Sequence, residues 1–137
     1  PKPLVALMDG ITMGGGFGVA GPCRYRVATA RTRWAMPETG IGFFPDIGSG
    51  YFLARAPGHS GSFLAVTGMT IGPRDALYGG FATHGADSAI FADLMRNLEQ
   101  DPVNTEYIIN EMCQDIFEND ATAVLEKKHE IIDSIFC

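Results

Sequence analysis

The amino-acid sequence predicts an α/β fold in which short strands and helices alternate, followed by a group of acidic helices. Two observations lead to this prediction. All 17 glycines lie at or before Gly85, and seven of the eight prolines lie at or before Pro73. The net charge is +3 up to residue 86 and −9 beyond it. We therefore expect a turn-rich core over residues 1–87 and a helical region over residues 88–137.

The turn-rich part is expected to consist of short elements. The continuous apolar run at residues 4–8 is typical of a strand that is buried on both faces. Looser alternation at residues 25–29 and 33–36 predicts two further strands. Between the first two strands, six of the twelve residues from 10 to 21 are glycine, which indicates unusual dihedral angles or a close approach to the backbone. Short helices are expected after these strands at residues 51–56, 62–67 and 74–78.

The acidic part shows the periodicity of three amphipathic helices. Apolar residues recur at helical spacing over residues 91–98, 108–117 and 124–136. Pro102 separates the first helix from the second. Candidate N-caps precede the last two helices: Asn104, Thr105, Asn119 and Asp120. We expect these helices to cover the core or to pack toward a neighbouring subunit.

Composition and charge exclude several classes of partner. No stretch approaches the roughly 18 uncharged apolar residues that a membrane span requires, so we expect no membrane partner. The net charge of −6 over 137 residues argues against nucleic acid as the main partner. Three cysteines, Cys23, Cys113 and Cys137, have no metal-type spacing. They predict free thiols in a reducing compartment and no metal site.

The glycine cluster has three possible interpretations. Gly16, Gly18 and Gly21 match the G-x-G-x-x-G pattern of a dinucleotide-binding turn. That match stands too far beyond the strand that ends near Asp9, and the acid that would bind a ribose is missing. Three consecutive glycines from Gly14 can instead open a helix whose exposed N–H groups hold an oxyanion. The third interpretation is a close-packed turn without a chemical role.

Two of the four acidic residues before residue 87 lie in one apolar, turn-rich segment. They are Glu38 and Asp46, and their neighbours are apolar: Trp34, Met36, Phe43 and Phe44. A carboxyl group in such surroundings is expected to be partly desolvated, which suits acid–base chemistry. The alternative is that each acid caps a turn or a helix, and Asp46 is well placed to cap a helix that starts near Ile47.

Three basic side chains are further candidates for functional groups. His84 stands alone before a glycine at a turn, which is more typical of a structural histidine than of a catalytic one. Arg24 and Arg26 could meet the phosphates of a coenzyme. The strand that carries both arginines favours the alternative of a solvated face.

Five sequence motifs follow one another over residues 2–87. They are Lys2 to Gly10 with Gly14-Gly15-Gly16, Met36-Pro37-Glu38, Gly42-Phe43-Phe44-Pro45, Gly48-Ser49-Gly50 with Leu53-Ala54-Arg55, and Leu64 to Gly68. In this order and at these spacings they resemble the crotonase (enoyl-CoA hydratase/isomerase) superfamily. Within it, the chain is most similar to the 3-hydroxyisobutyryl-CoA hydrolases. Gly18 stands where hydratases carry a catalytic Glu, and Asp46 stands where they commonly have Gly.

The resemblance implies a crotonase-like ββα spiral core, present here in part, followed by the acidic helices. It implies hydrolysis of a short 3-hydroxyacyl-CoA thioester, as in valine degradation. Glu38 would activate water or attack the thioester carbon, and Asp46 would contact the 3-hydroxyl or the leaving thiolate. Gly15, with Gly14 and Gly10, would form the oxyanion and substrate-binding site. No cofactor is implied, because CoA is part of the substrate.

Other functions of the same family stay open. One is a hydratase or isomerase that uses Glu38 alone, and another is a catalytically inactive crotonase-like binding subunit. In the family, part of the site comes from sequence upstream of Lys2, so we expect residues 1–137 to need a further segment or a homo-oligomeric partner. Ser49 replaces a usual glycine and is expected to shift the loop beside Asp46. The implied location is the cytoplasm of a bacterium or the mitochondrial matrix of a eukaryote.

Overall fold

The computed structural model describes residues 2–114, 116–117 and 123–136. Its strands are β1 (Val5–Met8), β2 (Ile11–Met13), β3 (Tyr25–Ala28), β4 (Arg33–Ala35) and β5 (His84–Gly85). Its α-helices are α1 (Gly15–Ala20), α2 (Ser49–Leu53), α3 (Ser60–Thr67), α4 (Pro73–Tyr78), α5 (Phe91–Gln100), α6 (Thr105–Met112) and α7 (His129–Phe136). Three 3₁₀ segments complete the description: η1 (Pro37–Ile41), η2 (Ser88–Ile90) and η3 (Pro102–Asn104).

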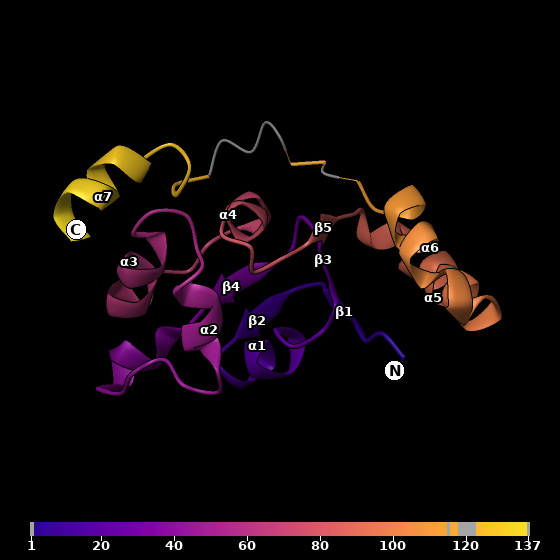
Figure 1. Ribbon diagram of the computed structural model, residues 1–137, viewed down its shortest axis with the longest axis horizontal. Coiled ribbons are helices and arrows are strands. Elements are labelled where there is room, and N and C mark those ends of the chain that lie inside the picture. Colours follow the sequence, from indigo (N-terminus) through magenta and orange to yellow (C-terminus); the bar gives the residue numbers. More distant parts are fainter. Residues whose placement is uncertain (1, 115, 118–122, 137) are drawn as a thin grey trace.

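Successive turns of the chain add strands to two small parallel sheets (Figure 1). β1, β3 and β5 form the first sheet, in which Val5 lies opposite Tyr25. β2 and β4 form the second sheet, in which Thr12 lies opposite Trp34. Parallel strands need a crossover that returns the chain to the starting edge, and β2 and α1 lie in the crossover from β1 to β3. The strand–strand–helix order confirms the predicted α/β fold with a spiral core.

Aromatic packing holds together β4, α1 and the segment that precedes β5. Trp34 on β4 stacks on Phe81 with ring centroids 3.9 Å apart. Phe17 on α1 meets Trp34 edge to face at 5.1 Å. All three side chains are fully buried, and such pairs add about 0.5–1.5 kcal/mol beyond the area that they bury. α1 is therefore fixed against β4, so the turn before α1 and the segment after β4 keep a constant relation.

The acidic helices flank the core and do not cover α1. α5 and α6 pack at the sheet formed by β1, β3 and β5, where Leu94 joins Tyr25 and Val27 in a second apolar cluster. α7 packs on α3, with the rings of Phe63 and Phe136 5.7 Å apart. Figure 1 shows α5 and α6 at one end of the molecule and α7 at the other. The expectation that these helices cover the core is therefore confirmed at the sheet and at α3, but not at the glycine turn.

The boundaries of the acidic helices also differ from the prediction. α6 ends at Met112, so Phe117 does not continue the second helix. Asn104 is the N-cap residue of α6, but its side chain makes no capping bond there. Instead, the Asp101 side chain caps η3 by accepting the Asn104 N–H. Thr105 is not the N-cap but the first residue of α6, and its hydroxyl donates to the Pro102 carbonyl. The remaining candidate caps, Asn119 and Asp120, lie outside the described residues. Within the described ranges, no helix is both long enough and apolar enough to cross a membrane.

Candidate active site

Pairing of β2 with β4 brings the glycine turn next to Glu38. The last pair in register is Met13 opposite Ala35, and both strands end there. The Gly14 N–H then donates to the Ala35 carbonyl at 3.2 Å. Beyond β4 the chain turns into η1, whose second residue is Glu38. Two segments that are more than twenty residues apart in sequence therefore meet at one point.

The Glu38 carboxylate lies directly against Gly14. A Cβ atom on Gly14 would stand 2.9 Å from Glu38 Oε1. Gly14 also has φ +47°, in the left-handed region that side chains disfavour. Position 14 therefore requires glycine for two separate reasons, namely its backbone conformation and the space that the carboxylate takes.

The second carboxylate oxygen of Glu38 is buried without a hydrogen-bond partner. Leaving a buried acceptor unsatisfied costs about 1–3 kcal/mol, and more for a charged group. Buried polar atoms without partners are rare in native proteins, and a catalytic role is one of the recognised reasons for them. The orphan oxygen therefore marks Glu38 as a candidate functional group.

The residue that follows Asp46 in sequence, Ile47, contacts α1. Ile47 packs on the first turn of α1, where its Cγ2 atom stands 2.3 Å from the position that a Cβ on Gly18 would take. Its Cδ1 atom stands 3.8 Å from the corresponding position on Gly15. Glycine at position 18 thus allows the loop that carries Asp46 to lie on α1. No hydrogen bond joins the carboxyl groups of Asp46 and Glu38, both of which lie in the described ranges.

Asp46 does not cap a helix with its side chain, contrary to the structural alternative. The N-cap residue of α2 is Gly48, with φ +75° and no side-chain capping bond. Asp46 takes part through its backbone, since its carbonyl accepts the Ser49 N–H at 2.9 Å. Ser49 is buried, and its hydroxyl oxygen has no hydrogen-bond partner. The Asp46 carboxylate is half-buried in the loop and is not used for capping.

Ile47 is a residue of this region that the sequence did not point to. Its φ of 53° makes it the one non-glycine residue with positive φ in the described ranges. For a β-branched side chain, the left-handed conformation costs about 1–2 kcal/mol. Strained residues cluster at functional sites. Because β-branched residues avoid this conformation, no local sequence rule could have indicated it.

Gly10 lies apart from Glu38, at the opposite end of β2 from Gly14. β2 separates the two glycines by about 13 Å at the usual rise per residue. Gly10 has φ +140° in the turn between β1 and β2, and its carbonyl accepts the Arg33 N–H at 2.9 Å. Its position makes it a turn residue, and no contact places it beside the Glu38 carboxylate.

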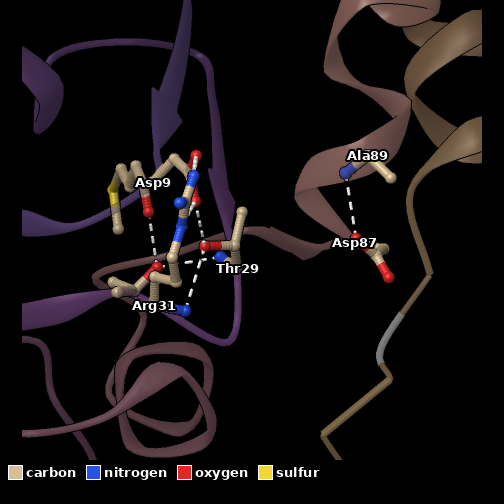
Figure 2. A network of polar contacts seen from close by, with 7 residues as sticks. Asp9, Thr29, Arg31, Asp87 and Ala89 are labelled. Carbon is tan, nitrogen blue, oxygen red and sulfur yellow. Dashed lines mark hydrogen bonds and ion pairs between the residues drawn. The ribbon is translucent and has the colours of Figure 1, made fainter.

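A polar network stands at that end of β2 (Figure 2). The Asp9 carboxylate accepts the Thr29 hydroxyl at 2.7 Å and the Arg31 Nε–H at 2.9 Å. A second Arg31 nitrogen pairs with the other carboxylate oxygen. The hydrogen bonds from Arg31 and then Thr29 hold the pKa of Asp9 below its ordinary value. This network ties the end of β1 to the β3–β4 turn and is separate from the glycine turn.

The apolar neighbours predicted around the two acids divide into two groups. Trp34 and Met36 are fully buried in the core. Phe43 and Phe44 stack on each other with centroids 4.4 Å apart, but they are 48% and 64% exposed. Only two of the four apolar neighbours are therefore buried, and the desolvation of the acids stays a prediction.

The basic candidates have structural roles. The Arg26 guanidinium donates to four backbone carbonyls, those of Gly21, Cys23, Gly80 and Phe81. Arg24 pairs with Glu106 at 3.0 Å on the surface. His84 Nε2 lies 3.1 Å from Asn110 Oδ1, which ties β5 to α6. These contacts agree with the structural interpretation of His84 and show that Arg26 is not a solvated side chain.

The dinucleotide-binding interpretation fails on geometry. Gly16 and Gly18 lie inside α1 and Gly21 directly follows it, so the pattern does not form a strand-to-helix turn. The glycines at 18 and 21 instead allow close packing, because Ile47 and the Phe52 ring occupy the space of their side chains. In the part of the chain that the structure describes, no group of three or more metal-ligating side chains is found.

The fold and the glycine turn with its adjacent carboxylate define the class of protein. Residues 1–137 match the model of the family described as enoyl-CoA hydratase/isomerase, and the chain belongs to this family. Among solved structures, it is similar to a carnitinyl-CoA dehydratase from Mycobacterium thermoresistibile, with a TM-score of 0.86 and 40% identity over 98% of this chain and 38% of that one. It is also similar to an enoyl-CoA hydratase from Rhodobacter sphaeroides 2.4.1, with a TM-score of 0.81 and 37% identity over 100% of this chain and 38% of that one.

The similar curated relatives carry a more particular name. The mitochondrial 3-hydroxyisobutyryl-CoA hydrolase of Gallus gallus is 44% identical over 98% of this chain and 36% of its own length. The Homo sapiens protein of the same name is 42% identical over the same shares. The chain thus spans little more than a third of the length of these relatives. The similarity confirms the predicted resemblance to 3-hydroxyisobutyryl-CoA hydrolases.

Proposed function

We propose that the protein hydrolyses a short 3-hydroxyacyl-CoA thioester such as 3-hydroxyisobutyryl-CoA. The observation that carries this proposal is the Glu38 carboxylate, which lies against Gly14 and has one buried oxygen without a partner. Such an oxygen is an acceptor ready for a proton from outside the chain. The names of the chicken and human relatives support the reaction and the substrate class.

Gly15 supplies the oxyanion donor in this proposal. It is the first residue of α1, and the N–H groups of the first helical turn have no acceptor within the helix. When the thioester carbonyl is attacked, its oxygen becomes negative, and a donor already in place lowers the barrier by about 3–4 kcal/mol. The preceding Gly14, with positive φ, sets the direction in which this N–H points.

Glu38 activates the attacking water in this proposal. Its carboxylate accepts a proton from water as the water oxygen bonds to the thioester carbon, and the carbon–sulfur bond breaks when the tetrahedral intermediate collapses. In the alternative route, the Glu38 carboxylate attacks the thioester carbon and displaces the thiolate, and water then hydrolyses the resulting anhydride. Asp46 binds the 3-hydroxyl or protonates the departing thiolate. The two routes differ in whether oxygen-18 from water enters Glu38.

The test is release of CoA thiol from 3-hydroxyisobutyryl-CoA by the whole protein and its Glu38→Gln variant. Loss of a general base costs about 100- to 10,000-fold in rate, so we expect at least a 100-fold lower kcat with acyl-CoA binding retained. Glu99→Gln, an exposed change on α5, is the matched control and should keep full activity. Wild-type protein that releases no thiol contradicts the proposal.

Hydration of an enoyl-CoA is the second candidate, because the two similar solved structures are named as a dehydratase and a hydratase. Gly18 counts against it, because the resemblance places the catalytic Glu of hydratases at this position and glycine has no carboxyl group. Ile47 occupies the space that such a side chain would need. Loss of crotonyl-CoA absorbance without thiol release would favour hydration. Acyl-CoA binding with neither activity would favour an inactive binding subunit.

The partners and compartment follow the same proposal. The acyl-CoA substrate is the small-molecule partner, and a further segment of the same protein or a second copy completes its pocket. The chicken and human relatives are named mitochondrial, which supports the matrix as the compartment of a eukaryotic protein. Fractionation of cells that express the tagged whole protein tests this location.

A further inference from the structure

The side chain of Ile47 stands beside the glycine turn but has no part in the proposed chemical steps. Its Cγ2 atom lies 2.3 Å from the position that a Cβ on Gly18 would take. Its Cδ1 atom lies 3.8 Å from the position that a Cβ on Gly15 would take. The two glycines are three residues apart on α1 and therefore share one face of it. Ile47 thus lies on the face that starts at the proposed oxyanion donor.

Burial does not explain why the fold holds Ile47 there. The residue is 53% exposed and has a backbone conformation that isoleucine avoids. A strained conformation persists only where the surrounding structure requires it, and such residues cluster at ligand sites. An exposed isoleucine held under strain against two glycines indicates a surface that a ligand contacts.

We infer that Ile47 forms a wall of the acyl pocket and limits the size of the acyl group, an inference that rests on the proposed function. Glu38 stands against Gly14, and Ile47 stands against Gly15 and Gly18. A thioester carbonyl bound to the Gly15 N–H therefore lies between the carboxylate and the isoleucine. A short branched acyl group fits beside the Ile47 methyl groups, whereas a long acyl chain meets them.

The test uses the whole protein and acyl groups of increasing length. Affinities are measured by calorimetry for thioether analogues of butanoyl-, hexanoyl- and octanoyl-CoA, which cannot be hydrolysed, and kcat/KM is measured for the matching thioesters. Because one methylene in an apolar pocket changes discrimination by about tenfold or more, Ile47→Ala should shift the octanoyl-to-butanoyl ratio at least tenfold toward octanoyl. Ile47→Val should shift it less.

Two further variants make the result decisive. Ile47→Gly removes both the side chain and the backbone strain, so it gives the same answer if the alanine variant folds poorly. Ile131→Ala, an equally exposed isoleucine on α7 (59%), should leave the ratio unchanged.

The outcomes separate this inference from the proposed function. An unchanged octanoyl-to-butanoyl ratio in both Ile47→Ala and Ile47→Gly overturns the inference that Ile47 limits the acyl group, while wild-type hydrolysis still supports the proposed reaction. A shifted binding ratio without any hydrolysis supports this role of Ile47 and overturns the proposed reaction. Failure of the wild-type protein to bind any of the analogues overturns both.

Discussion

Gly14→Ala is the substitution that tests the geometry of the site most directly. The new Cβ would stand 2.9 Å from Glu38 Oε1, whereas ordinary contacts of such an atom begin at 3.4 Å. The carboxylate must therefore move by about 0.5 Å. Since a misplacement of about 1 Å costs about 100-fold in rate, we expect kcat for thioester hydrolysis to fall about tenfold or more.

The same substitution also strains the backbone, and a control separates the two effects. Alanine at the φ of Gly14 costs about 1–2 kcal/mol of folding free energy. Gly80→Ala also places a Cβ at positive φ, because Gly80 has φ +74°, but no atom lies within 4 Å of that Cβ. Urea unfolding should show a loss of stability in both variants, while thiol release should fall only in Gly14→Ala. Equal activity in the two variants would refute the reasoning.

Two further predictions concern stability. Both oxygens of buried Asp75 accept the Val124 N–H, and one also accepts the Leu125 N–H; Asp75→Asn should lower the unfolding free energy by about 2–3 kcal/mol, and unchanged hydrogen exchange of these two amides would contradict this. Arg31 lowers the pKa of Asp9 in the folded state. The stabilising contribution of ionised Asp9 is therefore present above about pH 4 and is lost as the pH falls through the folded pKa. Asp9→Asn should flatten this acid limb in urea titrations, and an unchanged limb would count against it.

Much of the fold could be predicted from local patterns. The apolar run at residues 4–8 and the periodicity at residues 91–98 correspond to β1 and α5, with ends displaced by one or two residues. β2 was not predicted, because Ile11–Met13 is only three residues long and lies among glycines. β5 has two residues, His84–Gly85. Such short strands form because they pair with strands that are distant in sequence, and this pairing cannot be predicted from the local sequence.

The candidate site divides in the same way. Gly14 and Glu38 were singled out by residue type and by resemblance, and the structure brings them into contact. The importance of Gly18 was seen only as a missing acid, whereas the structure shows that it makes room for Ile47. The sequence did not decide that Phe44 is exposed, because an apolar residue beside a turn can face either the core or the solvent.

The sequence by itself determined the class of fold, the family and the residue types at the glycine turn, because these depend on local pattern and motif order. The tertiary structure decided what surrounds each group. It placed the Glu38 carboxylate against Gly14 through the pairing of β2 with β4. It also held Ile47 in a conformation that its own side chain opposes. Only packing between distant segments supplies the free energy for such a contact or such a strain.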